Sequence, residues 1–521
     1  MVMQQASRVA LGVLLVSVSG CVAVSRTDGL RRVGQEVESA RGAAMPFASP
    51  AGNGASDTRV AELLAAPLTL SAAVEVAFLR NPQLLDAYAR LGLSQAEVVA
   101  ASRIGNPVIS GSVITGARER QVIGGIAQPV TDLLLLPARK RLAAGEYERT
   151  QHLVAATLLD LVRDTEIAWY RYVSAEQVRT MREAVTRSAD TSAALAQRFF
   201  DAGNTSDLEL TLNKAEAARA RVATLRAAAD ARAAKYDLQQ RMGLSGSPAW
   251  RTNSALPAPV SVAETPEALV TLAQHQRADL VAARQEVALV RDSLQIVRWW
   301  RWLGTVEVGV ERERETDGRT LTGPTLALAL PIFNQGQAGI ARAEAQLEQS
   351  RARLLTLETS VDNAVRLGLE RVTVAQQVAD EYRESLVPEH ALIVKRQQER
   401  QNFMFIGQFE LLLSKQQQYD TYQGYLEAVR DYWLARVDLT RAVGADLPSA
   451  IEAAGPAVGV DAILQAPVDS TQHGGHHHPG TEPATPPTES ERTAMPDMPG
   501  KLGVAPPVPN ASDTPPAPKG D

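Results

Sequence analysis

The longest hydrophobic pattern in this chain is helical, and it occurs twice. Residues 137–200 and 337–403 each predict a helix of roughly 65 residues, on the order of 100 Å at the usual helical rise. A shorter helical pattern of roughly 38 residues follows each long one, ending at Gly243 and at Gly444, where glycine suits a helix C-cap. Each half of the chain is therefore expected to contain a helical hairpin.

Shorter helical patterns precede each hairpin, at residues 68–102 and 265–301. One short helix and one return helix, laid end to end, match the length of a long helix. We therefore expect rods in which one strand is continuous and the other consists of two pieces. Among the prolines, Pro82 interrupts the first short helix, Pro137 suits the first position of a long helix, and Pro388 predicts a kink in the other.

Between short and long helices the periodicity changes to two, which predicts strands. Residues 108–114 and 122–126 form one strand pair, and residues 306–311 and 325–330 form another. Alternation of bulky apolar with small or polar residues is typical of a membrane β-barrel, and one hairpin per half is too little sheet for a soluble core. The tryptophans within residues 299–302 either mark a membrane interface or pack between helix and strands.

The second half of the sequence repeats the first at a shift of about 201 positions, without a gap over roughly forty residues. Such a period is too long for a solenoid unit and indicates a duplicated half-molecule. The matched pairs include Glu209 with Glu410, Lys214 with Lys415, Asp237 with Asp438, and Gly243 with Gly444. The predicted divisions are a signal peptide (1–20), a lead segment (21–66), two repeats (67–245 and 246–446) and a tail (447–521).

The N-terminus predicts export and lipidation. Arg8 precedes an apolar run of about ten residues, which is too short to span a bilayer. The run ends at Cys21, the only cysteine of the chain, after small residues that look like a bacterial lipobox. A chance cysteine in a signal peptide is the alternative. The lead segment after Cys21 is expected to be extended, and the absence of aspartate directly after it favours the outer membrane.

The tail is rich in proline, threonine, alanine and glycine and is expected to be disordered. It contains the clustered histidines His473, His476, His477 and His478. Imidazole together with nearby methionines suits copper, while imidazole alone also suits zinc or nickel. The alternative is a tail that only solvates. No cofactor is expected in the folded part.

Composition excludes some functions. A net charge of −6 with 21% charged residues is too little basic charge for a nucleic-acid partner. The sequence contains no apolar stretch of the length that a transmembrane helix needs. It also lacks a nucleophile elbow, a phosphate loop or a spaced ligand set in its body, so we expect that the protein is not an enzyme.

Local motifs resemble the TolC-type outer-membrane efflux family, in its lipidated branch. They are Leu68-Thr69-Leu70-Ser71, Asn81-Pro82-Gln83-Leu84, the hairpin exit at 330–336, and the tips at 202–210 and 406–412. The resemblance covers about residues 60–446; the first hairpin exit, at 128–137, departs from the simpler form. It implies a mainly α fold with a β-barrel part, in which three chains form a helical tunnel and share a twelve-stranded transmembrane barrel.

The same resemblance implies partners: a homotrimer in outer-membrane lipid, a periplasmic adaptor at the tunnel tip, and an inner-membrane resistance-nodulation-division pump. We expect a passive efflux channel, with heavy-metal cations such as copper as cargo because of the histidines. The same duct for drugs or secreted protein is the first alternative. A periplasmic coiled-coil adaptor or scaffold is the second, although an adaptor would carry a single hairpin.

The tips are the first candidate site. Asp201 and Asp207 would form acidic rings in a trimer, which would repel one another and favour cations. Asp207 alternatively caps the return helix. Gly203 and Gly407 are expected to serve backbone geometry, and Glu410, like its repeat equivalent Glu209, is a helix-start charge.

The strand at residues 306–314 is the second candidate site. Glu307 and Glu311 would line an acidic lumen, with Glu313 nearby. Solvated charge at the extracellular surface explains them equally well.

Overall fold

The computed structural model describes residues 27–42, 54–116, 120–246, 249–252, 255–302, 304–448 and 457–460. All of them belong to the first of two units, Met1–Val468; the second unit, Asp469–Asp521, contains none. Cys21 and the histidines His473, His476, His477 and His478 therefore lie outside the described residues, and their predicted roles stay predictions.

The first hairpin consists of α6 (Val130–Asp201), a helix of 72 residues, and α7 (Asp207–Arg241). The long helix begins earlier than the sequence pattern predicts. Strand β2 runs directly into it at Pro129, so Pro137 lies inside the helix and not at its first position. The expectation for Pro137 was wrong because no loop residues separate strand from helix at this exit.

The second hairpin has a π-helical irregularity close to Pro388, where the sequence predicts a kink. Its long helix consists of α10 (Gln337–Glu381), a π-helical turn η1 (Tyr382–Leu386) and α11 (Val387–Asn402), and α12 (Gln408–Val443) returns. The π turn ends two residues before Pro388, whose ring has no N–H to donate to the helix. The chain thus accommodates the proline by widening one turn.

Two short helices precede the first hairpin and meet it end to end. Between α4 (Leu70–Arg80) and α5 (Pro82–Ala101), the Asn81 side chain caps α5 by accepting from the Gln83 N–H. The Asn81 amide also donates to the Arg241 carbonyl at the end of α7, at 2.7 Å. The helices α5 and α7 both pack along α6 and meet at this joint. The predicted rod, in which one long helix lies beside two shorter helices placed end to end, is therefore confirmed.

The second half builds its joint with a different residue. Arg277 lies between α8 (Pro266–Gln276) and α9 (Ala278–Trp300), and its guanidinium donates to the Ala442 carbonyl at the end of α12, at 2.9 Å. Gly243 and Gly444 follow the two return helices in left-handed conformation, with φ of 69° and 80°. The sequence pattern therefore placed both helix ends correctly.

The two halves share one aromatic core near the middle of the helices. The rings of Tyr170 on α6 and Trp433 on α12 are stacked with centroids 5.4 Å apart, and Trp169 and Tyr432 pack edge-on against them. The Trp433 indole N–H donates to the Pro257 carbonyl at 2.8 Å. Burial of these large rings stabilises the contact between the repeats.

The lead segment is not extended throughout, as the sequence reading expected. It contains α2 (Thr27–Arg41) and α3 (Gly54–Ala65), and α2 buries Val33 and Val37 in a cluster with apolar residues of α6. These valines lie four residues apart and, with Leu30 and Ala40, form one apolar face of a helix whose other residues are mainly polar. The pattern is short, so it is easily missed.

Part of the expected disordered tail is also ordered. Strand β6 (Ala457–Val458) pairs antiparallel with β3 (Leu256–Pro257). The boundary drawn at residue 447 was therefore wrong for these residues. A two-residue strand has no period that a sequence can reveal, and here the partner strand determines it.

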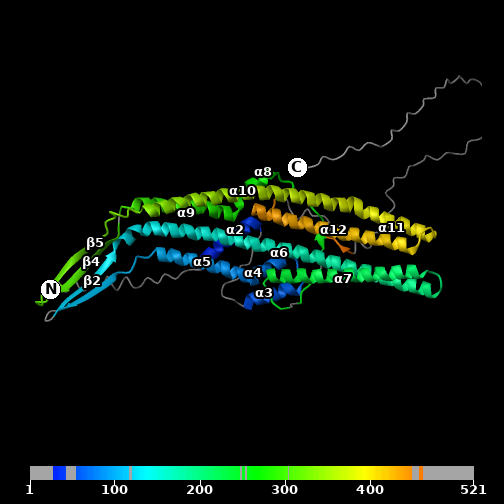
Figure 1. Cartoon of the computed structure of the whole chain (residues 1–521), viewed down its shortest axis with the longest axis horizontal. Coiled ribbons are helices and arrows are strands. Elements are labelled where there is room, and N and C mark those ends of the chain that lie inside the picture. Colours follow the sequence, from blue (N-terminus) through cyan, green and yellow to red (C-terminus); the bar gives the residue numbers. More distant parts are fainter. Residues whose placement is uncertain are drawn as a thin grey trace, which may run out of the picture. The chain divides into compact units, whose positions relative to one another are not determined.

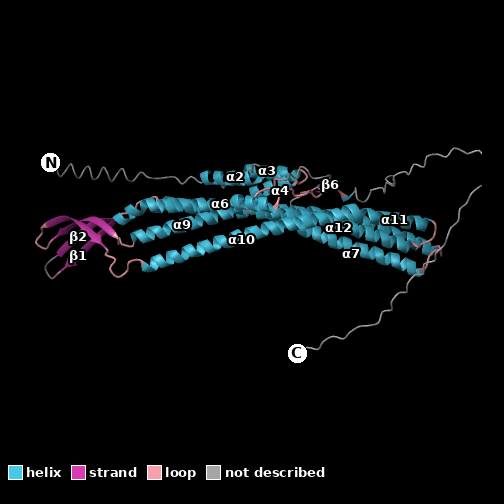
Figure 2. Cartoon of the chain, turned by 90° about the horizontal axis from the view of Figure 1, so that it is seen from above, coloured by secondary structure: helices cyan, strands magenta, loops and turns pink. Residues whose placement is uncertain are grey.

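A four-stranded antiparallel sheet lies at the end of the helices opposite the hairpin turns (Figures 1 and 2). Its order is β1 (Val108–Thr115), β2 (Arg120–Pro129), β4 (Val306–Arg314) and β5 (Thr320–Leu328). The central pairing, β2 with β4, joins the strand pairs of the two repeats. The predicted four strands are confirmed, with β5 beginning earlier than expected.

No helix among the described residues is long and apolar enough to cross a membrane.

Candidate functional site: hairpin tips and strand faces

The tip of the first hairpin is a tight polar turn between α6 and α7. Gly203 adopts a left-handed conformation with φ of 75°, and the Asn204 N–H closes the helix end on the Phe199 carbonyl at 2.8 Å. Asp201, the last residue of α6, accepts a hydrogen bond from the Gln197 side chain at 2.8 Å. The predicted geometric role of Gly203 is confirmed.

Ser206 and not Asp207 caps the return helix of this tip. The Ser206 hydroxyl accepts from the Glu209 N–H at 3.2 Å, and the Glu209 carboxylate accepts from the Thr205 hydroxyl at 2.6 Å. The capping alternative for Asp207 was therefore wrong. Asp207 is the first helical residue, exposed, with its charge at the positive end of the helix dipole.

The tip of the second hairpin closes in the same way with different side chains. The Phe405 N–H bonds the Arg400 carbonyl at 2.9 Å, and the left-handed residue is Met404, with φ of 60°. Met404 is 92% exposed, between the exposed rings of Phe403 and Phe405, whose centroids are 6.2 Å apart. Three adjacent apolar side chains thus project from this turn.

Gly407 does not have the backbone role expected of it. Its φ is −77° and its ψ 165°, an extended conformation that any residue adopts, and it precedes α12 without a side-chain cap. The strained position is Met404 instead. Glu410 lies in the first turn of α12, as predicted for a helix-start charge.

Sequence reasoning missed the apolar second tip. The signal was present, because Phe403, Met404 and Phe405 are consecutive large apolar residues in a segment that must turn. The repeat register also pairs Gly203 with Met404. Both tips lie at the end of the helices farthest from the sheet (Figure 1).

The strand register separates two chemically different faces of the sheet, because successive side chains point to opposite sides. One face carries mainly large apolar residues: Ile109, Val113, Val122, Ile126, Val308, Val310, Leu326 and Leu328. The other face carries mainly small or polar residues, including Ser110, Ser112, Gly125, Ala127, Gly309 and Thr325.

Glu307, Glu311 and Glu313 all lie on the polar face. Glu311 pairs with Gly125 and Glu313 with Ile123, and the Gln121 amide donates to the Glu313 carboxylate. On β2 the residues of this face are half-buried while those of the apolar face are exposed. The polar face is therefore the more enclosed one, which is where a lumen-lining carboxylate would lie.

Exposed aromatic residues lie where the sheet meets the helices. Trp299 is 82% exposed, Trp302 is exposed with the Arg301 guanidinium 4.4 Å from its ring centroid, and Phe333 is fully open to solvent. Packing between helix and strands does not account for Trp299 and Trp302. The aromatic-belt interpretation stays a prediction.

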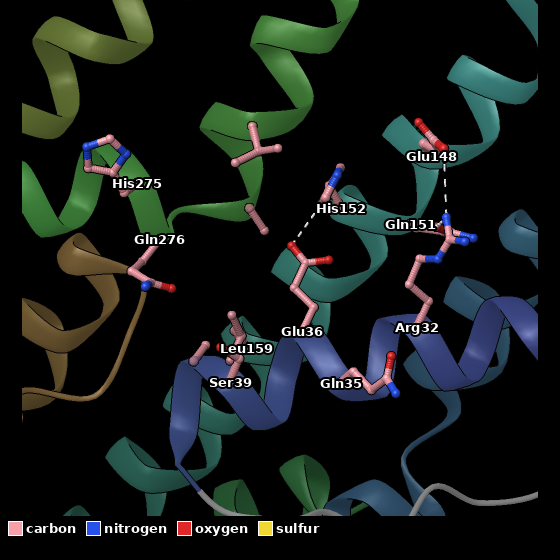
Figure 3. Close-up of a pocket in the computed structure, with 13 residues that line it drawn as sticks. Arg32, Gln35, Glu36, Ser39, Glu148, Gln151, His152, Leu159, His275 and Gln276 are labelled. Carbon is pink, nitrogen blue, oxygen red and sulfur yellow. Dashed lines mark hydrogen bonds and ion pairs between the residues drawn. The ribbon is translucent and has the colours of Figure 1, made fainter. Parts of the chain in front are cut away.

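A polar pocket lies between α2, α6 and the α8–α9 joint (Figure 3). His152 on α6 bonds the Glu36 carboxylate at 2.8 Å, and Arg32 lies 3.8 Å from Glu148. The hydrogen bond with Glu36 raises the pKa of His152 above its ordinary value. His275 lines the opposite side of the pocket. These contacts attach the lead helix to the first hairpin.

Among the described residues, no group of three or more histidine, cysteine, aspartate or glutamate side chains is placed to hold a metal ion.

Comparison with known proteins gives a fold. No protein-family model and no curated protein matches the sequence. Among solved structures, CusC, described as undergoing transmembrane channel formation, aligns with a TM-score of 0.63 and 16% identity over 72% of this chain and 92% of that one. The chain has the fold of outer-membrane channels. The CmeC outer membrane channel of Campylobacter jejuni aligns with a TM-score of 0.60 and 12% identity over 77% of this chain and 88% of that one. The outer membrane protein VceC of Vibrio cholerae aligns with a TM-score of 0.60 and 14% identity over 73% of this chain and 96% of that one.

Proposed function

We propose that this protein is the outer-membrane channel of a tripartite efflux system of the TolC type, conducting cargo passively from periplasm to exterior. The observation that carries the proposal is the sheet with one apolar exposed face and one enclosed polar face, continuous with two long helical hairpins. An apolar outer face suits lipid and a polar inner face suits water.

The sheet supports a trimer. Among the described residues of the single chain, β1 and β5 each have an edge that pairs with no other strand, and exposed edges attract other strands. Four strands are too few to close a barrel around a channel, whereas three chains supply twelve. Each chain would contribute its polar face, with Glu307 and Glu311, to one shared lumen.

The tips would seal the tunnel and bind a periplasmic adaptor, which links the channel to a resistance-nodulation-division pump. The channel has no catalytic step, and energy comes from the pump. In a trimer, Asp201 and Asp207 supply six carboxylates near the opening, and their repulsion favours cations and an open tip. The apolar tip at Phe403–Phe405 suits the seal or the adaptor contact.

Lipidation at Cys21 would anchor the lead segment to the membrane, and the protein would reside in the outer membrane. For cargo we propose heavy-metal cations, copper ahead of zinc, on the basis of the tail histidines. Deleting residues 470–480 tests this cargo. Lower metal tolerance of the deletion strain supports a metal cargo. Unchanged metal tolerance, together with a loss of drug tolerance, favours a channel for drugs.

Planar bilayers test the channel directly. The purified protein should give single-channel conductance, and its unheated form should migrate as a trimer on a denaturing gel. Glu307→Gln/Glu311→Gln should lower cation preference, because it removes six charges from a trimeric lumen. Glu97→Gln/Glu370→Gln, which neutralises exposed residues of α5 and α10, is the matched control. A delipidated monomer that dissolves without detergent would refute the proposal.

A further inference from the structure

Strand β4 sorts its charges by sign. Its glutamates, Glu307, Glu311 and Glu313, lie on the polar face, whereas Arg312 and Arg314 lie on the apolar face with Val308 and Val310. Both arginines are exposed. Charge that is merely solvated near a turn has no reason to divide in this way, since water reaches both faces of an open turn.

Strand β2 adds a third arginine to the same face. Arg314 pairs with Val122 and Arg312 with Gly124, so Arg120, two residues before Val122, projects from that face beside Arg314. Arg120 is exposed as well. Residues two apart on a strand are separated by about 7 Å, so three guanidinium groups gather within a small area. We call Arg120, Arg312 and Arg314 the arginine cluster.

The cluster has no carboxylate partner on the strands. No ion pair joins Arg120, Arg312 or Arg314 to another described residue of the chain. The nearby glutamates of β4 point to the other face, so they do not neutralise the cluster. Three arginines beside an apolar surface, without an ion pair to another described residue, match an anionic ligand that also has an apolar part.

The cluster occupies one end of the apolar face, next to the turns that join β1 to β2 and β4 to β5. The exposed Trp299 and Trp302 lie at the end of α9 and just after it, shortly before β4 begins at the opposite end of that sheet. Tryptophan is typical of the interface of a membrane, so exposed tryptophans at one end of the sheet and the cationic border at the other fit the two interfaces of one bilayer. In the proposed channel the helices are periplasmic, and the cationic border is at the outer surface.

We infer that the arginine cluster binds phosphate groups of the phosphorylated glycolipid in the outer leaflet. Arginine recognises phosphate with two parallel hydrogen bonds, and the adjacent valines would contact the acyl chains. This inference rests on the proposed function, because the face must lie in the outer membrane. It assigns a specific lipid partner to that face.

The experiment compares lipid binding to the purified full chain by native mass spectrometry in detergent. The probes are diphosphoryl lipid A, its dephosphorylated form, and phosphatidylglycerol. The wild type should prefer diphosphoryl lipid A over the other two. Arg120→Gln/Arg312→Gln/Arg314→Gln should weaken that binding about 100-fold, taking the usual contribution of each basic residue at an anionic membrane surface.

Two further variants make the result specific. Arg219→Gln/Arg226→Gln/Arg232→Gln removes the same charge from exposed positions of α7 and should leave lipid A binding unchanged. The triple lysine variant at the cluster should bind with intermediate affinity, because lysine keeps the charge and loses the paired hydrogen bonds. Single-channel conductance of each variant shows that the barrel has formed.

Equal binding of wild type to the phosphorylated and dephosphorylated lipid would overturn the inference, and so would equal binding to phosphatidylglycerol. Both results leave the channel proposal intact if the same protein conducts in planar bilayers. Absence of single-channel conductance in the wild type itself would overturn both the lipid inference and the channel proposal. The wild-type comparison needs no variant, so a variant that fails to fold does not prevent the test.

Discussion

The two hairpin tips have the same backbone closure and opposite surfaces. In the first, the Asn204 N–H reaches the Phe199 carbonyl, and in the second the Phe405 N–H reaches the Arg400 carbonyl. These pairs coincide under the repeat shift of about 201 residues. The left-handed position of the first tip is glycine, while Met404 occupies it in the second.

The difference separates what the fold requires from what function adds. A left-handed conformation costs a residue with a side chain about 1–2 kcal/mol, and glycine avoids this cost. The second tip keeps both the strain and three exposed apolar side chains, Phe403, Met404 and Phe405. Exposed apolar side chains and a strained residue in one turn are the features that the proposed seal or docking surface would use.

The largest expected effect distinguishes the two joints rather than the tips. A β-carbon at Gly243 would lie 2.5 Å from the Arg80 carbonyl oxygen, a backbone atom, whereas at Gly444 it would lie 2.6 Å from Cγ of Arg277, a side-chain atom. Both positions also have positive φ. Gly243→Ala should therefore cost about 3 kcal/mol and Gly444→Ala about 2 kcal/mol.

Thermal unfolding of the detergent-solubilised variants measures this difference. Gly92→Ala is the control, because a β-carbon there meets no atom within 4 Å and φ is ordinary. Equal losses at Gly243 and Gly444 would show that the two joints tolerate crowding alike.

Exchanging the tip residues gives the next effect. Met404→Gly should stabilise the second tip by about 1 kcal/mol, and Gly203→Met should destabilise the first by a similar amount. Hydrogen exchange of the turn amides reports the local change. In the proposed channel, Met404→Gly should also weaken efflux although it stabilises the fold. If efflux is unchanged, Met404 is not part of the seal or the adaptor contact.

Regular elements were predictable from the sequence because their hydrophobic patterns extend over many residues. The hairpins, the four strands and the glycines that end both return helices follow from spacing alone. The two-piece strands followed from helix lengths, and the joints at Asn81 and Arg277 explain how the pieces meet.

What failed depends on short segments and on tertiary contacts. Helix α2 has only a few buried residues, such as Val33 and Val37, and β6 has two residues in all. Capping of α7 was one of two interpretations of Asp207, because a carboxylate is a good cap, but Ser206 is one residue earlier and has the extended backbone that a cap needs. The sheet faces required the register, which a single sequence does not fix.

Capping distinguishes the tips by a smaller amount. Ser206→Ala should cost about 1 kcal/mol, since it leaves the Glu209 N–H without the hydroxyl. Gly407 already has cap geometry without a side chain, so Gly407→Ser should gain only a few tenths of a kcal/mol. Hydrogen exchange at the first turns of α7 and α12 measures both. A larger effect at Gly407 would contradict the assigned caps.

The smallest expected effect concerns a contact that belongs to the first hairpin. His152 faces Glu36 and Arg32 on α2 and Glu148 on its own helix, and the Glu36 hydrogen bond raises the pKa of His152. Because the folded pKa is raised, this stabilisation is complete below about pH 6.5, the ordinary value, and is lost as the pH rises through the folded pKa.

Protection of α2 amides, corrected for intrinsic exchange, should therefore decrease with rising pH in the wild type. His152→Gln should remove this pH dependence, while His390→Gln, in the second hairpin, should retain it. A pH dependence that persists in His152→Gln would assign the attachment of α2 to its buried valines alone.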